Sequence, residues 1–169
     1  MKIVLIGYMG SGKSVIGAAL SKKKNLEFID LDSYIEKKED CTISDIFKFK
    51  GEIYFRKIEG VYLKELLSSS NNFILSLGGG TPCYGKNMDL ILHTSNSIYL
   101  KSSISELFNR LKNETNHRPL IATIGLHNLK EYIAKHLFER APYYEQATIV
   151  IETDKKSITK IVDEIESLV

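Results

Sequence analysis

Residues Gly7 to Ser14 read Gly-Tyr-Met-Gly-Ser-Gly-Lys-Ser, and they constrain the fold more than any other part of the sequence. The octapeptide matches every fixed position of the pattern Gly-x-x-x-x-Gly-Lys-Ser/Thr. The apolar run Lys2 to Ile6 precedes it and is typical of a central parallel strand, while the amphipathic segment Lys13 to Lys24 follows it. A glycine-rich turn between a buried strand and a helix predicts a loop that binds nucleotide phosphates.

Each residue type in the loop suits that chemistry. The glycines allow successive N–H groups to point toward one anion, and Gly10, Ser11 and Gly12 form the centre of this cradle. Lys13 places an ammonium near the transferred phosphates, and the Ser14 hydroxyl is a hard oxygen ligand suited to Mg²⁺. The alternative is a glycine-rich turn that binds nothing.

Strands alternate with helices along the rest of the chain, which predicts a three-layer α/β/α sandwich with a central five-stranded parallel sheet. We expect a single domain over residues 1–169. Four further strands are expected at Leu26–Ile29, Phe73–Leu77, Ile98–Leu100 and Thr148–Ile151. Helices are expected at about Ser33–Glu39, Glu52–Leu67, Ser103–Lys112, Asn128–Arg140 and Ser157–Leu168, with a short helical turn at Ser44–Phe49. Ligands in such folds bind at the carboxyl ends of the strands.

Composition limits the classes of partner. The net charge of +2, with acidic and basic residues mixed, argues against a protein that mainly neutralises nucleic-acid phosphates. No apolar run approaches the ~20 residues that span a bilayer, and no secretory signal is visible, so we expect a cytoplasmic protein. Cys41 and Cys83 are expected to be free thiols.

Asp30 and Asp32 follow the second expected strand. Alternation along an extended segment would place both carboxylates on one side. Beside a nucleotide, Asp30 can hold the water shell of a metal, and Asp32 can accept a hydrogen bond from an attacking hydroxyl. The alternative is that Asp32 only caps the next helix.

Two further features point to an acceptor site. Arg56 lies three residues before Glu59 on an expected helix, so Glu59 can orient its guanidinium toward a carboxylate, although a solvated surface charge is the alternative. Gly78, Gly79 and Gly80 follow the third strand and suit close approach of the backbone to a ligand, although a simple loop remains open.

Two of the arginines in the second half of the chain are candidate site residues. Arg118 is in an aperiodic stretch, about residues 113–126, that could close over a triphosphate as a lid. Arg140 is expected in the last turn of a helix, where its charge suits the helix dipole, and it is a candidate second carboxylate ligand. A surface loop and a dipole contact are the respective alternatives.

In this order, the motifs resemble the shikimate kinase family, over nearly the whole chain. The resemblance implies transfer of the γ-phosphoryl of ATP to the 3-hydroxyl of shikimate, in the pathway to aromatic amino acids, with Mg²⁺ as cofactor. It assigns Gly10 to Ser14 to ATP, Ser14 to Mg²⁺, and Asp30 to the metal environment. Asp32 becomes the proposed base and a shikimate contact. Arg56, Gly78 to Gly80 and Arg140 become shikimate contacts, and the helical segment at about 31–60 becomes a shikimate-binding segment. Arg118 of Arg-Pro-Leu becomes a lid contact to ATP.

The resemblance also implies a monomer that binds small molecules, without nucleic acid or membrane. Val15 occupies a position beside the ATP loop where the family often has a hydroxyl residue. Arg110 and Lys156 (or Lys155) are candidates for contacts to adenine, which no motif fixes. Two rivals remain: a kinase for another polyol acid such as gluconate, and a nucleotide-dependent switch that binds a protein partner.

Overall fold

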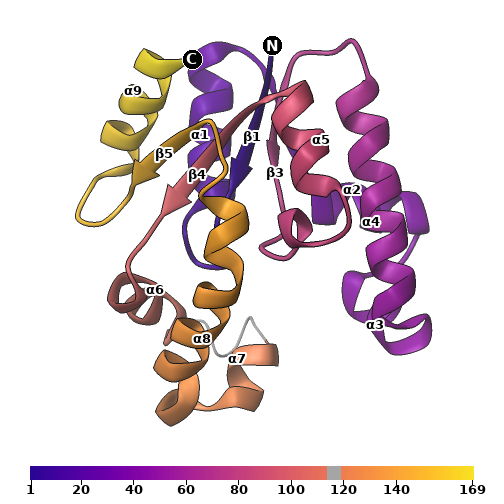
Figure 1. Ribbon diagram of the computed structural model, residues 1–169, viewed down its shortest axis with the longest axis vertical. Coiled ribbons are helices and arrows are strands. Elements are labelled where there is room, and N and C mark those ends of the chain that lie inside the picture. The colour runs from indigo at the N-terminus through magenta and orange to yellow at the C-terminus, as the bar shows by residue number, and fades with distance from the viewer. Residues whose placement is uncertain (114–118) are drawn as a thin grey trace.

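The computed structural model describes residues 1–113 and 119–169, and within them five strands form one parallel sheet (Figure 1). The spatial order is β2-β3-β1-β4-β5, so that β1 lies in the centre. The strands are β1 (Lys2–Ile6), β2 (Glu27–Asp30), β3 (Phe73–Ser76), β4 (Asn96–Lys101) and β5 (Ile149–Glu152). All four pairings are parallel, which confirms the predicted sheet.

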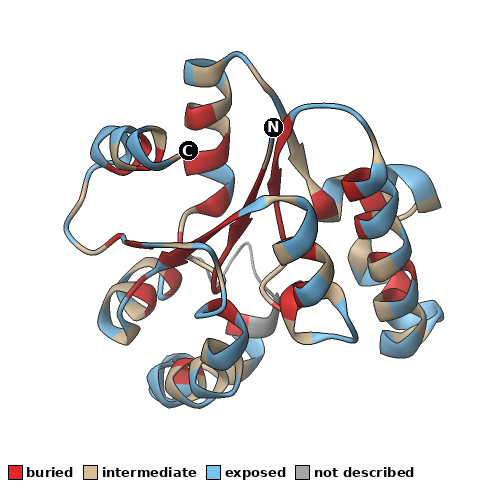
Figure 2. Ribbon diagram, turned by 45° about the horizontal axis from the view of Figure 1, so that its top comes forward, coloured by how far each residue is buried: buried red, intermediate tan, exposed pale blue. Residues whose placement is uncertain are grey.

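Helices cover both faces of the sheet. Alternating side chains of β1 point to opposite faces, as strand geometry requires. Ile3 and Leu5 pack with α1 (Lys13–Lys24) and α9 (Ile158–Leu168). Val4 and Ile6 pack on the other face with residues from the remaining helices. Strands β1, β3 and β4 are mostly buried, whereas the edge strands β2 and β5 are partly exposed (Figure 2). Those helices are α2 (Leu31–Glu39), α3 (Ile43–Phe49), α4 (Gly51–Ser68), α5 (Asn87–Thr94), α6 (Ile104–Leu111), α7 (Pro119–Ile124) and α8 (Leu126–Tyr144).

Side-chain caps fix several helix starts. Ser103 Oγ accepts a hydrogen bond from the Glu106 N–H at 3.2 Å, so α6 begins where the capping pattern predicts. Ser157 caps α9 in the same way through the Lys160 N–H. Thr42 caps α3 by accepting from the Asp45 N–H. Local sequence therefore determines these boundaries.

Two helices were not expected from the sequence. The structure has α5 at Asn87–Thr94, and α7 at Pro119–Ile124 inside the stretch read as aperiodic. Proline at the first position of α7 suits a helix start, because its missing N–H has no partner there in any case. Ile121 of α7 is fully buried, so packing accounts for a helix that periodicity does not indicate.

The carboxyl ends of the strands face the end of the molecule where α3, α6, α7 and α8 gather (Figure 1). Both ends of the chain lie away from this edge (Figure 1). Within the described ranges, no helix combines the length and apolar character needed to cross a membrane. The segments that carry the candidate site residues are therefore expected at the carboxyl edge of the sheet.

Candidate active site

A cavity of about 670 Å³ opens at the carboxyl edge of the sheet. It unites the predicted phosphate loop, both predicted carboxylates and part of the triple glycine. Its lining comprises Met9, Gly10, Ser11, Gly12, Lys13, Ser14, Val15, Ile16, Asp30, Asp32, Ser76, Leu77, Gly78, Gly79, Arg110, Lys156, Ile158 and Ile161. A space of this size and mixed polarity suits a nucleotide.

The loop between β1 and α1 has the backbone that an anion cradle needs. Gly10 and Gly12 have φ angles of 79° and 92°, a region that residues with side chains rarely adopt. Gly12 is also the N-cap of α1 and offers no side-chain cap. The first N–H groups of α1 and its positive dipole end are thus directed toward the cavity.

Lys13 is largely buried at the start of α1. Its ammonium donates hydrogen bonds to Gly7 O at 2.8 Å and Tyr8 O at 2.9 Å. The loop therefore holds the lysine against its own carbonyl groups. A polyphosphate must draw the ammonium away from these carbonyls to be neutralised by it.

Ser14 and Asp30 provide the hard oxygen atoms that a divalent cation prefers. Ser14 Oγ donates to Asp30 Oδ2 at 3.3 Å, so the hydroxyl and the carboxylate face the same part of the cavity. Among the described residues, no group of three or more His, Cys, Asp or Glu side chains is placed to hold a metal. The donor set fits a cation that takes most of its ligands from phosphates and water.

Asp32 lies in the first turn of α2, which corrects the expectation of an extended Asp-Leu-Asp segment. Asp30 ends β2 and is the N-cap, and its Oδ1 accepts from the N–H groups of Asp32 and Ser33. The chain turns into a helix at Leu31 because this cap satisfies the free N–H groups there. Asp30, not Asp32, is thus the capping residue, and both still line the cavity.

Burial raises the pKa of Asp32, the negative charges of Asp30 and Glu59 add to this, and Lys13 opposes it, so that the pKa is about 6. A carboxylate with this pKa is mostly ionised at neutral pH and still basic enough to accept a proton or a strong hydrogen bond. Asp32 thus has the properties of a general base or an orienting group.

The triple glycine is the point on which the predicted acceptor residues converge. A β-carbon placed on Gly78 would lie 3.3 Å from Asp32 Oδ1, and one on Gly79 would lie 3.1 Å from Arg140 Nη1. One on Gly80 would lie 2.8 Å from Arg56 Nη2. Three successive glycines therefore make room for one carboxylate and two guanidinium groups that arrive from three different helices.

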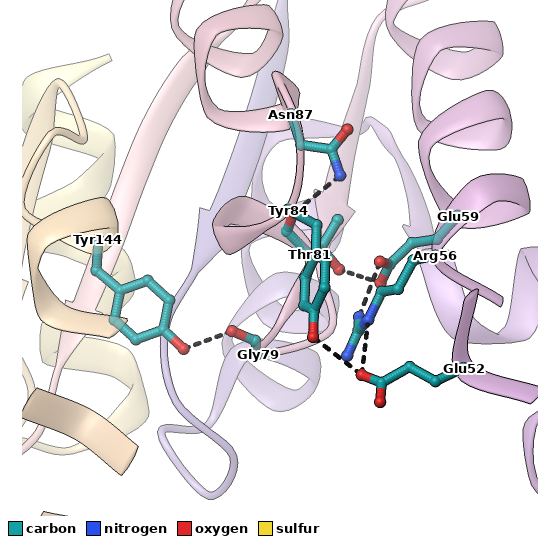
Figure 3. Close-up of polar contacts among 8 residues, drawn as sticks. All are labelled: Glu52, Arg56, Glu59, Gly79, Thr81, Tyr84, Asn87 and Tyr144. Atoms are coloured by element: carbon teal, nitrogen blue, oxygen red, sulfur yellow. Dashed lines mark hydrogen bonds and ion pairs between the residues drawn. The ribbon is translucent and has the colours of Figure 1, made fainter. Parts of the chain in front are cut away.

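Arg56 is held by a buried acid, Glu59, which in turn accepts from a buried hydroxyl, that of Thr81 (Figure 3). Its Nη1 donates to Glu59 Oε2 at 2.9 Å, and Glu59 is 1% exposed. Thr81 Oγ donates to the other oxygen of Glu59 at 2.6 Å, and Asn87 Nδ2 donates to Thr81 O at 2.9 Å. The solvated-surface alternative for Arg56 is wrong, because its side chain is only 17% exposed.

Arg140 approaches from α8 on the other side. Its guanidinium carbon lies 5.8 Å from the centre of the Tyr8 ring, close enough for a cation–π contact. Tyr144 Oη donates to Gly79 O at 2.5 Å and ties the end of α8 to the glycines (Figure 3). The helix continues through Pro142 to Tyr144, so Arg140 is not in its last turn, and the dipole explanation for Arg140 is wrong.

A family model described as "Shikimate kinase" matches residues 9–169. The chain belongs to the shikimate kinase family. A shikimate kinase of Flavobacterium johnsoniae is 49% identical over 166 residues, which cover 97% of this chain and 96% of that protein.

Solved structures agree with this family assignment. A crystal structure of shikimate kinase from Bacteroides thetaiotaomicron has a TM-score of 0.92 and 34% identity, covering 99% of this chain and 97% of that one. Shikimate kinase from Acinetobacter baumannii in complex with shikimate has a TM-score of 0.87 and 32% identity, covering 99% and 91%. The predicted family, fold and enzyme class, an ATP-dependent kinase, are confirmed.

The candidate adenine contacts of this shikimate kinase family member, Arg110 and Lys156, line the same cavity. Arg110 Nη1 donates to Gly10 O at 3.1 Å while its Nε pairs with Glu106 at 2.9 Å. Lys156 pairs with Glu164 at 2.6 Å. Their contact with adenine, like that of Val15 with ATP, stays a prediction.

Sequence reasoning missed the apolar wall beside these cations. Ile158 and Ile161 of α9 also line the cavity, and they suit the flat face of a base. The Ser157 cap at the start of α9 was a visible signal, but nothing local indicated which helix face meets the loop. Ser11 is 1% exposed and packs beneath Gly7, so any phosphate contact of Ser11 would come through its backbone.

Arg118 lies outside the described residues, so its predicted contact with ATP stays a prediction. The same holds for most of the Arg-Pro-Leu segment of this shikimate kinase family member, where only the backbone of Pro119 and Leu120, in α7, is described. Cys41 and Cys83 are free thiols, as expected.

Proposed function

We propose that the protein transfers the γ-phosphoryl group of ATP to the 3-hydroxyl of shikimate, giving shikimate 3-phosphate and ADP. One observation carries the proposal: Asp32, Arg140 and Arg56 are backed in turn by Gly78, Gly79 and Gly80. Two cations and one carboxylate around a bare stretch of backbone suit an acceptor with a carboxylate at one end and a hydroxyl at the other.

The nucleotide half of the site consists of Gly10 to Ser14 and the amino end of α1. Backbone N–H groups and Lys13 bind the phosphates. Mg²⁺, held by Ser14 with Asp30 beyond it, would neutralise charge on the transferred phosphoryl group when bound. The 3.3 Å contact of Ser14 with Asp30 supports this pairing.

The acceptor half positions the hydroxyl. Arg56 and Arg140 bind the carboxylate of shikimate from opposite sides of the glycines and fix the ring between them. Asp32 accepts a hydrogen bond from the 3-hydroxyl and directs its oxygen at the γ-phosphorus. The new bond joins that oxygen to phosphorus as the bond to ADP breaks, and the hydroxyl proton passes to Asp32 or to water.

Arg118 and the segment about 113–126 complete the proposal as a lid that stabilises charge and excludes water during transfer. The helical segment at about 31–60 is proposed to carry acceptor contacts within the single domain. We further propose a cytoplasmic monomer. Light scattering of the purified protein tests the oligomeric state directly.

The activity is tested by incubating the protein with Mg-ATP and a panel of hydroxy acids and measuring ADP. We expect ADP only with shikimate. ADP with gluconate instead would replace the proposed acceptor, and ATP binding without any acceptor-dependent ADP would favour the nucleotide-dependent switch.

Two variants test the division of roles. Asp32→Asn is expected to reduce turnover by about 100-fold or more, the usual size of a general acid–base contribution. Near-normal turnover would rule out a base or orienting role. Arg56→Ala is expected to raise KM for shikimate with little change in KM for ATP, whereas Lys57→Ala, its exposed neighbour, is the control that should change neither.

A further inference from the structure

Arg56 Nε presents an unexplained feature next to the proposed acceptor site. This N–H group is buried, and it has no hydrogen-bond partner within the part of the chain that the structure describes. A carboxylate oxygen, Glu52 Oε1, forms an ion pair with Nε at 3.6 Å but lies beyond hydrogen-bond distance. Buried guanidinium donors normally have partners, so something must keep this carboxylate back.

Tyr84 is the residue that holds it. Tyr84 Oη donates to the same oxygen, Glu52 Oε1, at 2.9 Å (Figure 3). The Tyr84 ring also lies under the guanidinium of Arg56, whose central carbon is 4.1 Å from the ring centre. The Tyr84 side chain therefore packs against the face of the Arg56 guanidinium and also holds Glu52 by a hydrogen bond.

The position of Glu52 shows why its hydrogen bond with Tyr84 matters. Glu52 is in the first turn of α4, one turn before Arg56, so the two side chains lie on the same face of the helix. The helix start accounts for an acid there, but not for its bond to a tyrosine of the loop after β3. Without the hydroxyl, a shift of less than 1 Å would let Glu52 bond to Nε.

The charges around Arg56 favour a carboxylate ligand only while Glu52 forms no hydrogen bond with Nε. Glu59 already pairs with Nη1 and neutralises the cation from the buried side. A second close acid would fill the remaining edge of the guanidinium and repel an incoming carboxylate. Resting on the function proposed above, we propose that Tyr84 is a positioning residue that keeps Glu52 off Arg56 and so leaves this guanidinium open to the carboxylate of shikimate.

Kinetics of three variants test the proposal. Tyr84→Phe keeps the ring but frees Glu52, and it is expected to raise KM for shikimate about tenfold, the usual effect of one charged hydrogen bond. KM for ATP and kcat should stay within about twofold, because the nucleotide half is untouched. Glu52→Gln should lower KM for shikimate or leave it unchanged, and the double variant should match Glu52→Gln.

This rescue separates the proposal from a merely structural role. If Tyr84 only supports Arg56, removing Glu52 will not repair the Tyr84→Phe enzyme. If Glu52 only helps to hold Arg56, Glu52→Gln will itself raise KM for shikimate. Either result, or an unchanged KM in Tyr84→Phe, overturns the proposal.

A second readout needs no substrate. The ¹⁵N NMR signal of Arg56 Nε–H, assigned by its loss in Arg56→Lys, should move downfield and exchange more slowly with water in Tyr84→Phe, because Glu52 now bonds to it. An unchanged signal overturns the proposal even if shikimate proves not to be the acceptor. If the parent protein gives no shikimate-dependent ADP, the proposed function fails while this signal still decides the role of Tyr84.

Discussion

Gly80 lies directly against the guanidinium of Arg56, and a β-carbon there would meet Nη2 at 2.8 Å and Nη1 at 3.0 Å. Gly80→Ala is therefore expected to displace Arg56, which Glu59 and Tyr84 enclose on its other sides. We expect kcat/KM for shikimate to fall about 10- to 100-fold, since a misplacement of about 1 Å has this effect. Steady-state kinetics with each substrate varied will measure it.

The matched control for this change is Gly60→Ala on α4. Among the described residues, a β-carbon at Gly60 would meet only Asn87 Oδ1, at 3.4 Å, which is ordinary contact. Alanine should also favour the helix by up to about 1 kcal/mol. Equal losses of activity in both variants would mean that general damage to the fold, and not Arg56, explains the effect.

Asp32 makes the stability of the nucleotide-free protein depend on pH. Its pKa of about 6 is above the unfolded value near 4, so the folded state favours the protonated form. The stability linked to this proton is full below about pH 4 and is lost as pH rises through 6. Asp32→Asn cannot ionise, and it should be more stable than the parent by about 2 kcal/mol at pH 8.

Urea unfolding of both proteins between pH 4 and pH 8 measures this difference. The two stabilities should converge toward pH 4, where the parent carboxyl is also neutral. A gap that does not change with pH would assign the effect to packing or hydrogen bonding rather than to ionisation of Asp32.

The placement of residues in the site was predictable where one short motif carries them. The loop, the acids and the Arg56–Glu59 pair each lie within a few positions of one another. The contact of Tyr84 with Glu52 was not predictable, because it joins the loop after β3 to the start of α4. Likewise, Asp32 was read as extended because the capping role of Asp30 is visible only once the helix start is known.

At the scale of elements, Glu39 binds α2 to α4. Its carboxylate accepts from Tyr62 Oη at 2.7 Å and Tyr54 Oη at 2.8 Å, and it pairs with Lys50 at 3.0 Å. These bonds lower the pKa of Glu39. Glu39→Ala removes a shared acceptor from two tyrosines, and we expect a loss of about 2 kcal/mol in the free energy of unfolding, measured in urea.

Glu65→Ala is the control, because Glu65 also joins the two helices, through Lys38 at 2.7 Å and Tyr34 at 3.0 Å. Its side chain is 47% exposed, so we expect a much smaller loss than for Glu39→Ala. Equal losses in both variants would mean that burial does not distinguish the two contacts. The expectation that Glu39 contributes more than Glu65 would then be wrong.

Elements with a strong local pattern were predicted well, and those held by tertiary packing were not. Apolar runs indicated all five strands to within two residues of their ends. In contrast, α5 has no side-chain cap, and its start gives no sequence signal. Met88 and Ile91 are buried against neighbouring elements, so contacts that are distant in sequence stabilise it.

At the scale of the whole molecule, the two substrates are expected to bind to separable halves of one site. Lys13→Met should abolish the stabilisation by ATP while shikimate still stabilises the protein, and Arg140→Ala should do the reverse. Ligand at 100 times its Kd contributes about 2.7 kcal/mol, which a shift in the urea midpoint will detect.

The parent protein with each ligand alone provides the reference. If either variant loses both stabilisations, the halves are not separable. If Arg140→Ala keeps its stabilisation by shikimate, Arg140 is not a carboxylate ligand.

The architecture as a whole followed from alternating strands and helices, but the convergence of Arg56 and Arg140 on the glycines did not. These residues come from α4 and α8, and they lie against neighbouring glycines of the loop after β3, a strand that lies beside β1. Strand order is a property of the folded sheet that no local pattern encodes. Sequence therefore indicated the parts of the site, and topology brings them together.

The central position of β1 in the sheet affects which parts of the molecule can open locally. Its residues Ile3 to Ile6 are fully buried, and it is hydrogen-bonded to β3 on one side and β4 on the other. Its amides can exchange with deuterium only when the sheet itself comes apart, whereas β2 and β5 at the edges can open separately. The phosphate-binding loop thus follows directly from the strand that we expect to open most slowly. The segments around this loop can open to admit and release small molecules while β1 stays in place.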